Sequence, residues 1–120
     1  MPRLLEPLNE EEKEAAKRMI QAFNAYEAFV FEIGERKLFY NVIRKAGLEP
    51  LIIVREASRR KPLIYVILLN DRPCRNECNY QCRAVEEGEK KKCIEDCMSV
   101  CMENRKKYLI EALDNAIKNS

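Results

Sequence analysis

The chain has 120 residues, of which 47% are hydrophobic and 35% charged, and its net charge is only +2. This composition is typical of a soluble folded protein with a modest core, and it excludes a disordered chain. No apolar run is long enough to cross a bilayer or to act as a signal peptide, so we expect a cytoplasmic, intracellular protein.

The near-neutral total hides a basic middle segment. Residues 34–70 contain eight basic and three acidic residues, a net charge of +5, whereas residues 1–33 sum to −3 and residues 71–120 to zero. A basic stretch in a near-neutral chain is a typical electrostatic footprint of a surface that binds nucleic acid.

The first helix is predicted to begin at Asn9, because this residue and Glu12 have the spacing of an N-cap and its capping-box partner. Apolar side chains then recur at helical spacing as far as residue 33. They are Ala16, Met19, Ile20, Phe23, Tyr26, Val30 and Ile33. The pattern does not decide whether residues 10–33 form one helix or two.

A second helix is predicted for residues 35–46, between Gly34 and Gly47, with Leu38, Phe39, Val42 and Ile43 facing inward. The period then changes, because residues 51–54 and 63–69 are short runs rich in β-branched side chains, which indicate strands. The polar link between them contains Arg59, Arg60 and Lys61, so we expect an antiparallel hairpin with a basic tip.

The order of these elements resembles the winged-helix branch of the helix-turn-helix superfamily. In this resemblance, residues 29–34 form the end of a helix and its turn, and residues 45–48 lead into the hairpin. The resemblance covers residues 28–69 and implies that residues 35–46 are a recognition helix, that the hairpin is a wing, and that the ligand is double-stranded DNA. The side chains that suit phosphate and base-edge contact are Arg36, Lys37, Tyr40, Asn41, Arg44, Lys45, Arg59, Arg60 and Lys61. The plainer interpretation is a solvated helix face and a charged loop that prevents edge aggregation.

Six cysteines form two rows in which neighbours are four residues apart: Cys74, Cys78 and Cys82, then Cys93, Cys97 and Cys101. Residues four apart lie on one face of a helix, and Gly88 between the rows is suited to end the first helix. Two antiparallel helices that turn near Gly88 would bring the rows face to face. The spacing therefore predicts three nested disulfides, Cys74 with Cys101, Cys78 with Cys97 and Cys82 with Cys93.

The cysteine hairpin, residues 74–101, resembles the twin CX3C proteins of the mitochondrial intermembrane space and the plant α-hairpinins, in which paired CX3C motifs are bridged in nested order. The alternative is a thiolate site for zinc or an iron-sulfur cluster, which would require reduced cysteines. Intracellular disulfides persist in hyperthermophiles, and the abundance of Glu, Lys and Arg, with only two Gln, is typical of such organisms.

Apolar side chains continue at helical spacing beyond Cys101, so one helix is expected from about residue 90 to residue 118. These apolar residues are Tyr108, Leu109, Ala112, Leu113, Ala116 and Ile117. This stripe needs a surface to pack on. Either the front half of the same chain or a second subunit would supply it, and the second case gives a homodimer through the C-terminal helix.

The sequence thus predicts an α+β fold with a winged-helix-like domain at residues 1–70 and a cysteine-rich helical hairpin with a C-terminal helix at residues 71–120. The expected function is a small DNA-binding transcriptional regulator from a hyperthermophilic archaeon or its virus. The alternatives are a structural or protein-interaction module stabilised by the disulfides, and a thiolate metal-binding protein. No catalytic residue, cofactor, membrane contact or small-molecule substrate is expected, because the chain has no histidine and no phosphate-binding or nucleophile motif.

Overall fold

The computed structural model describes residues 6–58 and 60–120. The elements in chain order are α1 (Glu10–Ala25), β1 (Ala28–Glu32), the 3₁₀ turn η1 (Ile33–Glu35), α2 (Arg36–Ala46), β2 (Ile52–Ser58), β3 (Ile64–Leu69), α3 (Arg72–Gln81) and α4 (Glu87–Lys118). The predicted α+β class is confirmed. In the described part of the chain, no helix is long and apolar enough to span a membrane.

Helix α1 begins with the predicted capping box. The Asn9 side chain accepts a hydrogen bond from the Glu12 N–H at 2.8 Å, and the Glu12 carboxylate accepts one from the Asn9 N–H at 2.9 Å. The helix ends at Ala25, and the expected continuation of its apolar stripe is wrong. Tyr26, Val30 and Ile33 are 72%, 56% and 42% exposed.

The residues that follow α1 form strand β1 because their burial has a period of two. Phe29 and Phe31 are buried, whereas Val30 and Glu32 between them are exposed. This alternation of bulky aromatic side chains suits a strand with one face on the core. The prediction that residues 29–34 form the end of a second helix and its turn is therefore wrong.

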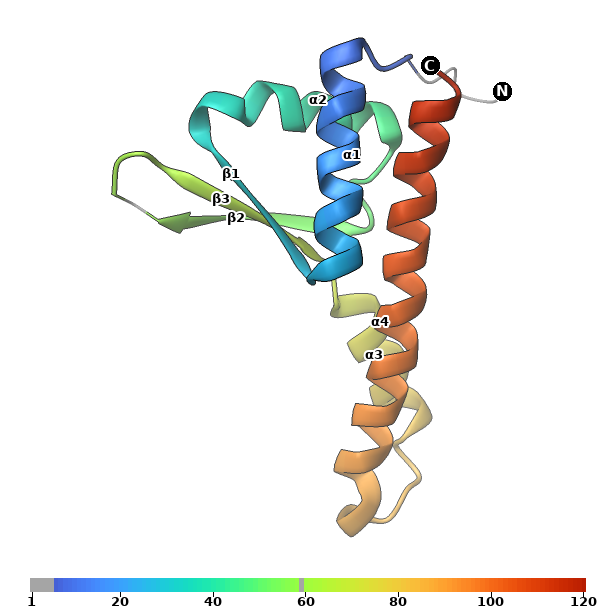
Figure 1. Ribbon diagram of the computed structural model, residues 1–120. Helices are drawn as coiled ribbons and strands as arrows, with labels where there is room; N and C mark the ends of the chain where they lie inside the picture. The colour runs from blue at the N-terminus through green and yellow to red at the C-terminus, as the bar shows by residue number, and fades with distance from the viewer. Residues whose placement is uncertain (1–5, 59) are drawn as a thin grey trace.

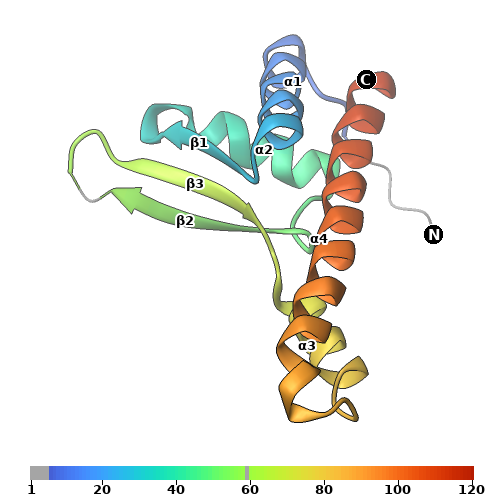
Figure 2. The ribbon, with the colours of Figure 1, turned by 60° about the horizontal axis from the view of Figure 1, so that its bottom comes forward.

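The three strands form one antiparallel sheet in the order β1-β3-β2. The predicted hairpin of β2 and β3 is present, and β1 pairs with the other edge of β3, placing Phe29 opposite Ile67 and Phe31 opposite Tyr65. These four side chains point to one face of the sheet. Figures 1 and 2 show α1 and α2 on one side of the sheet and the β2–β3 hairpin extending away from α4.

A single core joins the front half of the chain to the C-terminal helix. Its largest fully buried side chains are Met19, Phe23, Phe39, Val42, Leu48, Ile67, Leu109 and Leu113. The last two lie on α4, which packs against α1 and α2. Of the predicted apolar stripe at the end of α4, Leu109 and Leu113 are therefore buried within the monomer and Ala112, Ala116 and Ile117 are partly buried against the core, whereas Tyr108 is 63% exposed.

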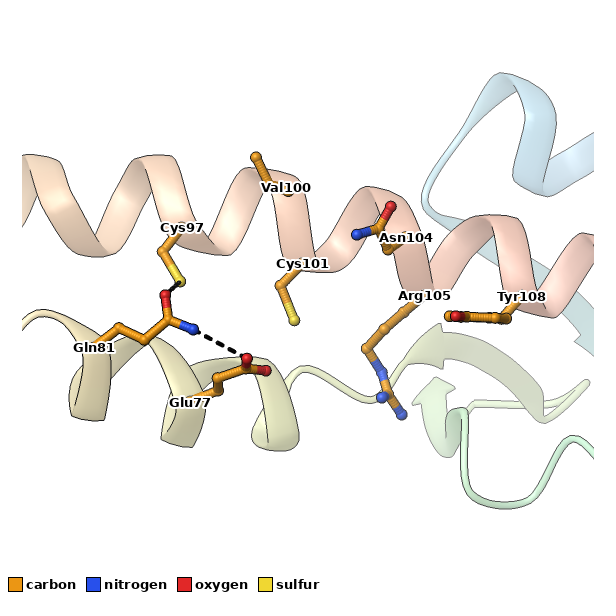
Figure 3. Close-up of a pocket in the computed structure, with 8 residues that line it drawn as sticks. All are labelled: Glu77, Gln81, Cys97, Val100, Cys101, Asn104, Arg105 and Tyr108. Atoms are coloured by element: carbon orange, nitrogen blue, oxygen red, sulfur yellow. Dashed lines mark hydrogen bonds between the residues drawn. The ribbon is translucent and has the colours of Figure 1, made fainter.

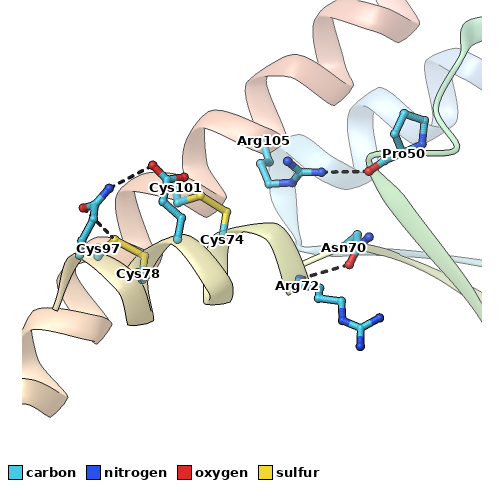
Figure 4. Close-up of a disulfide and its surroundings, with 10 residues drawn as sticks. Pro50, Asn70, Arg72, Cys74, Cys78, Cys97, Cys101 and Arg105 are labelled. Carbon is cyan, nitrogen blue, oxygen red and sulfur yellow. Dashed lines mark hydrogen bonds between the residues drawn. A yellow bond between two sulfur atoms is a disulfide. The ribbon is translucent and has the colours of Figure 1, made fainter. Parts of the chain in front are cut away.

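Helices α3 and α4 form the predicted antiparallel hairpin, and the three disulfides join the cysteines in nested order as expected. Figure 4 shows the two disulfides nearest the body, Cys74–Cys101 and Cys78–Cys97. The Cα atoms of the pairs are 5.7 Å apart for Cys74 and Cys101 and 5.6 Å apart for Cys78 and Cys97. In Figure 1 the hairpin extends away from the sheet as a rod made of α3 and the first half of α4.

The turn of the hairpin differs from the prediction. Helix α3 ends at Gln81 with Cys82 as its cap, and Gly88 lies inside the first turn of α4 instead of ending α3. Residues 82–86 make the connection. Glu87 and Glu89 in the first turn of α4 favour a helix start there, because negative charge is stabilised at a helix N-terminus.

Candidate nucleic-acid interface

Helix α2 keeps the outward face that the sequence predicts. Arg36, Lys37, Tyr40 and Arg44 are exposed, and Asn41 is half-buried. The opposite side of the helix carries Phe39, Val42 and Ile43, which are buried in the core. The helix ends at Gly47, whose φ of 68° gives the left-handed conformation of a glycine cap.

Arg36 connects α2 to the sheet. Its guanidinium carbon lies 5.3 Å from the centroid of the Tyr40 ring and 5.8 Å from that of the Tyr65 ring. A guanidinium that contacts aromatic rings by cation–π interaction has restricted freedom, while its N–H groups can still reach a phosphate or a base. Tyr65 belongs to β3, so this contact places a basic group between α2 and the hairpin.

Lys45 does not belong to this surface. Its side chain is only 13% exposed, and its ammonium group lies 2.7 Å from the carboxylate of Glu12, whose side chain is 3% exposed. The pair joins the end of α2 to the start of α1. Lys45 is therefore corrected from a candidate DNA contact to a structural residue.

Carboxylates reduce the positive charge at the far end of α2. Arg44 forms an exposed ion pair with Glu6 at 3.1 Å, which contributes little to stability and leaves the guanidinium accessible. Glu49 lies across a shallow groove from Tyr40, Asn41 and Arg44, with Ile52 and Val54 of β2 as the apolar part of the same groove. Among the described residues, Arg36 and Lys37 at the start of α2 have no carboxylate within ion-pair distance.

The hairpin tip is the second part of the candidate surface. Arg60 and Lys61 are exposed there, while Arg59 lies outside the described residues. In both ribbon views the tip extends beyond the body on the side where α2 begins (Figures 1 and 2). The structure thus brings the start of α2 and the tip of the hairpin to the same side of the molecule.

Sequence reasoning missed one basic side chain at this end. Arg18 of α1 forms an ion pair with Glu35 at 2.7 Å, and its guanidinium carbon lies 5.3 Å from the centroid of the Phe39 ring. The side chain is half exposed, at 50%. No local pattern could have found it, because Arg18 and Glu35 are brought together only by the packing of α1 against α2.

A separate hollow lies along the disulfide hairpin, between α3 and α4 (Figure 3). Glu77 accepts a hydrogen bond from the Gln81 amide at 3.0 Å, and Arg105 donates one to the Pro50 carbonyl at 2.9 Å, which holds α4 to the loop before β2. The other lining residues are Cys97, Val100, Cys101, Asn104 and Tyr108. They include no pairing of a nucleophile with a general base, so the hollow supports no catalytic mechanism.

The cysteines offer no thiolate in this structure, because all six are in disulfides. Among the described residues there is also no group of three or more cysteine or carboxylate side chains placed to hold a metal ion. The thiolate metal site therefore has no ligand set in the oxidised protein.

Comparison of the chain with protein-family models, with curated protein sequences and with solved structures finds no match.

Proposed function

We propose that this protein binds double-stranded DNA through the exposed side of α2 and the β2–β3 hairpin, and that it acts as a small transcriptional regulator of winged-helix-like design. The observation that carries the proposal is that Arg36 and Lys37 are exposed at the start of α2, and Arg60 and Lys61 at the tip of the hairpin. These two parts of the fold lie on the same side of the molecule (Figures 1 and 2). Basic side chains on a helix and on a neighbouring hairpin can contact phosphates on both sides of a groove.

The order of elements from α2 onward supports the winged-helix resemblance, whereas the elements before α2 differ from it. Helix α2 is followed directly by the β2–β3 hairpin, as a recognition helix is followed by a wing. The helix expected before α2 is replaced by β1 and η1, so residues 28–46 do not contain the helix pair of a helix-turn-helix motif. Helix α1 packs against α2 instead and is the element that would support it in a DNA groove.

The experiment is the affinity for a labelled random-sequence duplex as a function of salt concentration, measured by fluorescence anisotropy. Arg36→Ala/Lys37→Ala/Arg44→Ala removes three charges from α2. The matched control, Lys90→Ala/Lys91→Ala/Lys92→Ala, removes three charges from the first two turns of α4. Each phosphate contact contributes about −0.9 to the slope of log K against log salt concentration. We expect the α2 variant to flatten this slope by roughly 2 to 3 and the control to leave it unchanged.

Two outcomes would contradict the proposal. One is the absence of binding at low salt. The other is an equal loss for the two triple variants, because that would reflect total charge and not a surface on α2. Either outcome would favour the alternative function of a protein-interaction module. The structural feature that supports this alternative is an apolar groove on α4.

A further inference from the structure

A groove with an apolar floor lies where α4 leaves the body of the protein. Leu68 and Leu69 at the end of β3 line it on one side, and Ile94, Met98 and Met102 of α4 line it on the other. The groove encloses about 540 Å³ and is open to solvent. It therefore has room for side chains of another molecule.

The groove is lined by the same face of α4 that is buried in the core farther toward the C-terminus of this helix. Met98, Met102, Leu109 and Leu113 are separated by four, seven and four residues, spacings that keep side chains on one face of a helix. Leu109 and Leu113 are fully buried by the body, whereas Met98 and Met102 are only half-buried. The cystines hold α3 against a neighbouring side of α4, so in the described part of the chain no element covers the groove.

The sheet extends the same apolar surface. Leu68 pairs with Ala28 and Ile53, and the next position on this face places Val66 between Val30 of β1 and Arg55 of β2, where the apolar surface ends. Val30 is 56% exposed. Phe29 and Phe31 lie on the opposite face of the sheet, where Phe39 of α2 packs against their rings. The groove therefore lies on the other side of the sheet from the proposed DNA-binding helix.

The rim of the groove is acidic, although the chain as a whole is slightly basic. The charged side chains that line it are Glu27, Asp71, Glu95, Glu103 and Lys106, four carboxylates and one ammonium group. Arg75 pairs with Asp71 at 2.7 Å, whereas no cation among the described residues lies within ion-pair distance of Glu27, Glu95 or Glu103. The groove lining thus carries more negative than positive charge around an apolar floor.

We propose that this groove binds an amphipathic, positively charged helix of a partner protein. The apolar face of that helix would lie on Ile94, Met98 and Met102, which span roughly 12 Å along α4, about two turns of a helix. Its lysine or arginine side chains would pair with Glu95 and Glu103. Methionine side chains adapt to the shape of a docked apolar surface, and such a groove is a common way to bind a helix.

The charge of the rim favours this partner over a second copy of the chain. A twofold-related copy would pack the same groove against itself and bring the carboxylates of one rim close to those of the other. Like charges brought together at an interface oppose association, whereas a basic helix would neutralise them.

The test measures binding of two labelled model helices to the full chain with its disulfides intact. One peptide has leucines on one face and lysines on the other, and the second has the same leucines with glutamates in place of the lysines. We expect the lysine peptide to bind at least about tenfold more tightly than the glutamate peptide, a difference of about 1.4 kcal/mol. Glu95→Gln/Glu103→Gln should reduce this ratio severalfold.

A matched pair of variants locates the site. Met98→Asp is expected to abolish binding of the lysine peptide, while Val100→Asp, at a residue 64% exposed on another side of α4, should leave it unchanged. Circular dichroism and thermal unfolding verify that both variants are folded. Equal affinity for the two peptides, or an equal loss in the two variants, would overturn the proposal.

Two further measurements separate this inference from its alternatives. Light scattering that shows a wild-type dimer which Met98→Asp dissociates would overturn the proposal, because a second copy would then cover the groove. Met98→Asp is expected to bind duplex DNA as well as the wild type does, so a failure of the DNA proposal and a failure of this one would be distinguishable.

Discussion

The ammonium group of Lys45 lies 2.7 Å from the carboxylate of Glu12, with the two side chains only 13% and 3% exposed. The same Glu12 carboxylate oxygen accepts the capping hydrogen bond from the Asn9 N–H at 2.9 Å. One carboxylate oxygen thus secures the start of α1 and the end of α2 together. Since α2 carries the proposed DNA contacts, this pair also fixes the position of that helix.

Removing the lysine should be strongly destabilising. Lys45→Met would leave the buried carboxylate of Glu12 without its cation, and breaking one partner of a buried ion pair costs about 3 to 5 kcal/mol in the free energy of unfolding. Urea unfolding measures this change. The matched control is Lys37→Met on the exposed side of the same helix, which should alter stability by no more than about 0.5 kcal/mol. Equal effects of the two substitutions would show that the Lys45 pair is not structural.

The same pair makes stability depend on acid. Burial raises the pKa of Glu12, but the hydrogen bonds from the Lys45 side chain and the Asn9 backbone, with the charges of Lys45 and Arg44, lower it more, so the pKa lies below its usual value of 4.5. A lowered folded-state pKa stabilises the protein above pH 4.5, and this contribution is lost as the pH falls through the folded value. We therefore expect the free energy of unfolding to drop below pH 4.5 in the wild type and to fall less in Glu12→Gln. An equally steep loss in the variant would assign the acid sensitivity to other groups.

The sequence was informative where the determining interactions are local or strictly periodic. Asn9 and Glu12 are three residues apart, and the two cysteine rows repeat every four residues, so the cap and the nested pairing follow from spacing alone. Residues 26–33 are different, because their apolar side chains fit both a helical period and an alternating one. Residues 28–32 form a strand because they pair with β3, which lies more than thirty residues away in the chain. Such tertiary contacts outweigh local propensity.

The candidate surface shows the same limit. Lys37 and Lys45 look equivalent in the sequence of α2, yet Lys37 is exposed and Lys45 is paired with a residue 33 positions earlier in the chain. A helical-face argument separates buried apolar positions from polar ones, but it cannot show which polar side chains meet a charge on another helix. The apolar groove was missed for a related reason, since its two walls come from β3 and α4.

Two glycines should respond in opposite ways to the same substitution. Gly47 has a φ of 68°, a conformation that alanine adopts only with strain, so Gly47→Ala should destabilise the protein by about 1 kcal/mol. Gly88 lies in the first turn of α4 with open space around the position of an added Cβ, so Gly88→Ala should stabilise it by about 0.5 to 1 kcal/mol. Thermal unfolding of the two variants under identical conditions gives both values. A stabilising Gly47→Ala would contradict the left-handed cap at the end of α2.

Reduction of the disulfides should release α3 without unfolding the body. The only buried side chains of α3 and its cap are Cys74, Cys78 and Cys82, so the cystines are the main apolar contact between this helix and α4. Closing the inner loop between Cys82 and Cys93 alone contributes about 3 kcal/mol on the chain-entropy model. The core around Phe23 and Leu109 contains no cystine and does not depend on these bonds.

Hydrogen exchange with and without reductant measures this difference. The backbone amides of α3 should lose their protection after reduction, while those of β3 keep it, because local stability follows the contacts of each element. The double variant Cys78→Ser/Cys97→Ser, which leaves the flanking pairs intact, should show a smaller loss confined to α3. Retained protection of α3 after full reduction would mean that contacts other than the cystines hold the hairpin, whereas loss of protection in β3 would mean that the hairpin and the body unfold as one unit.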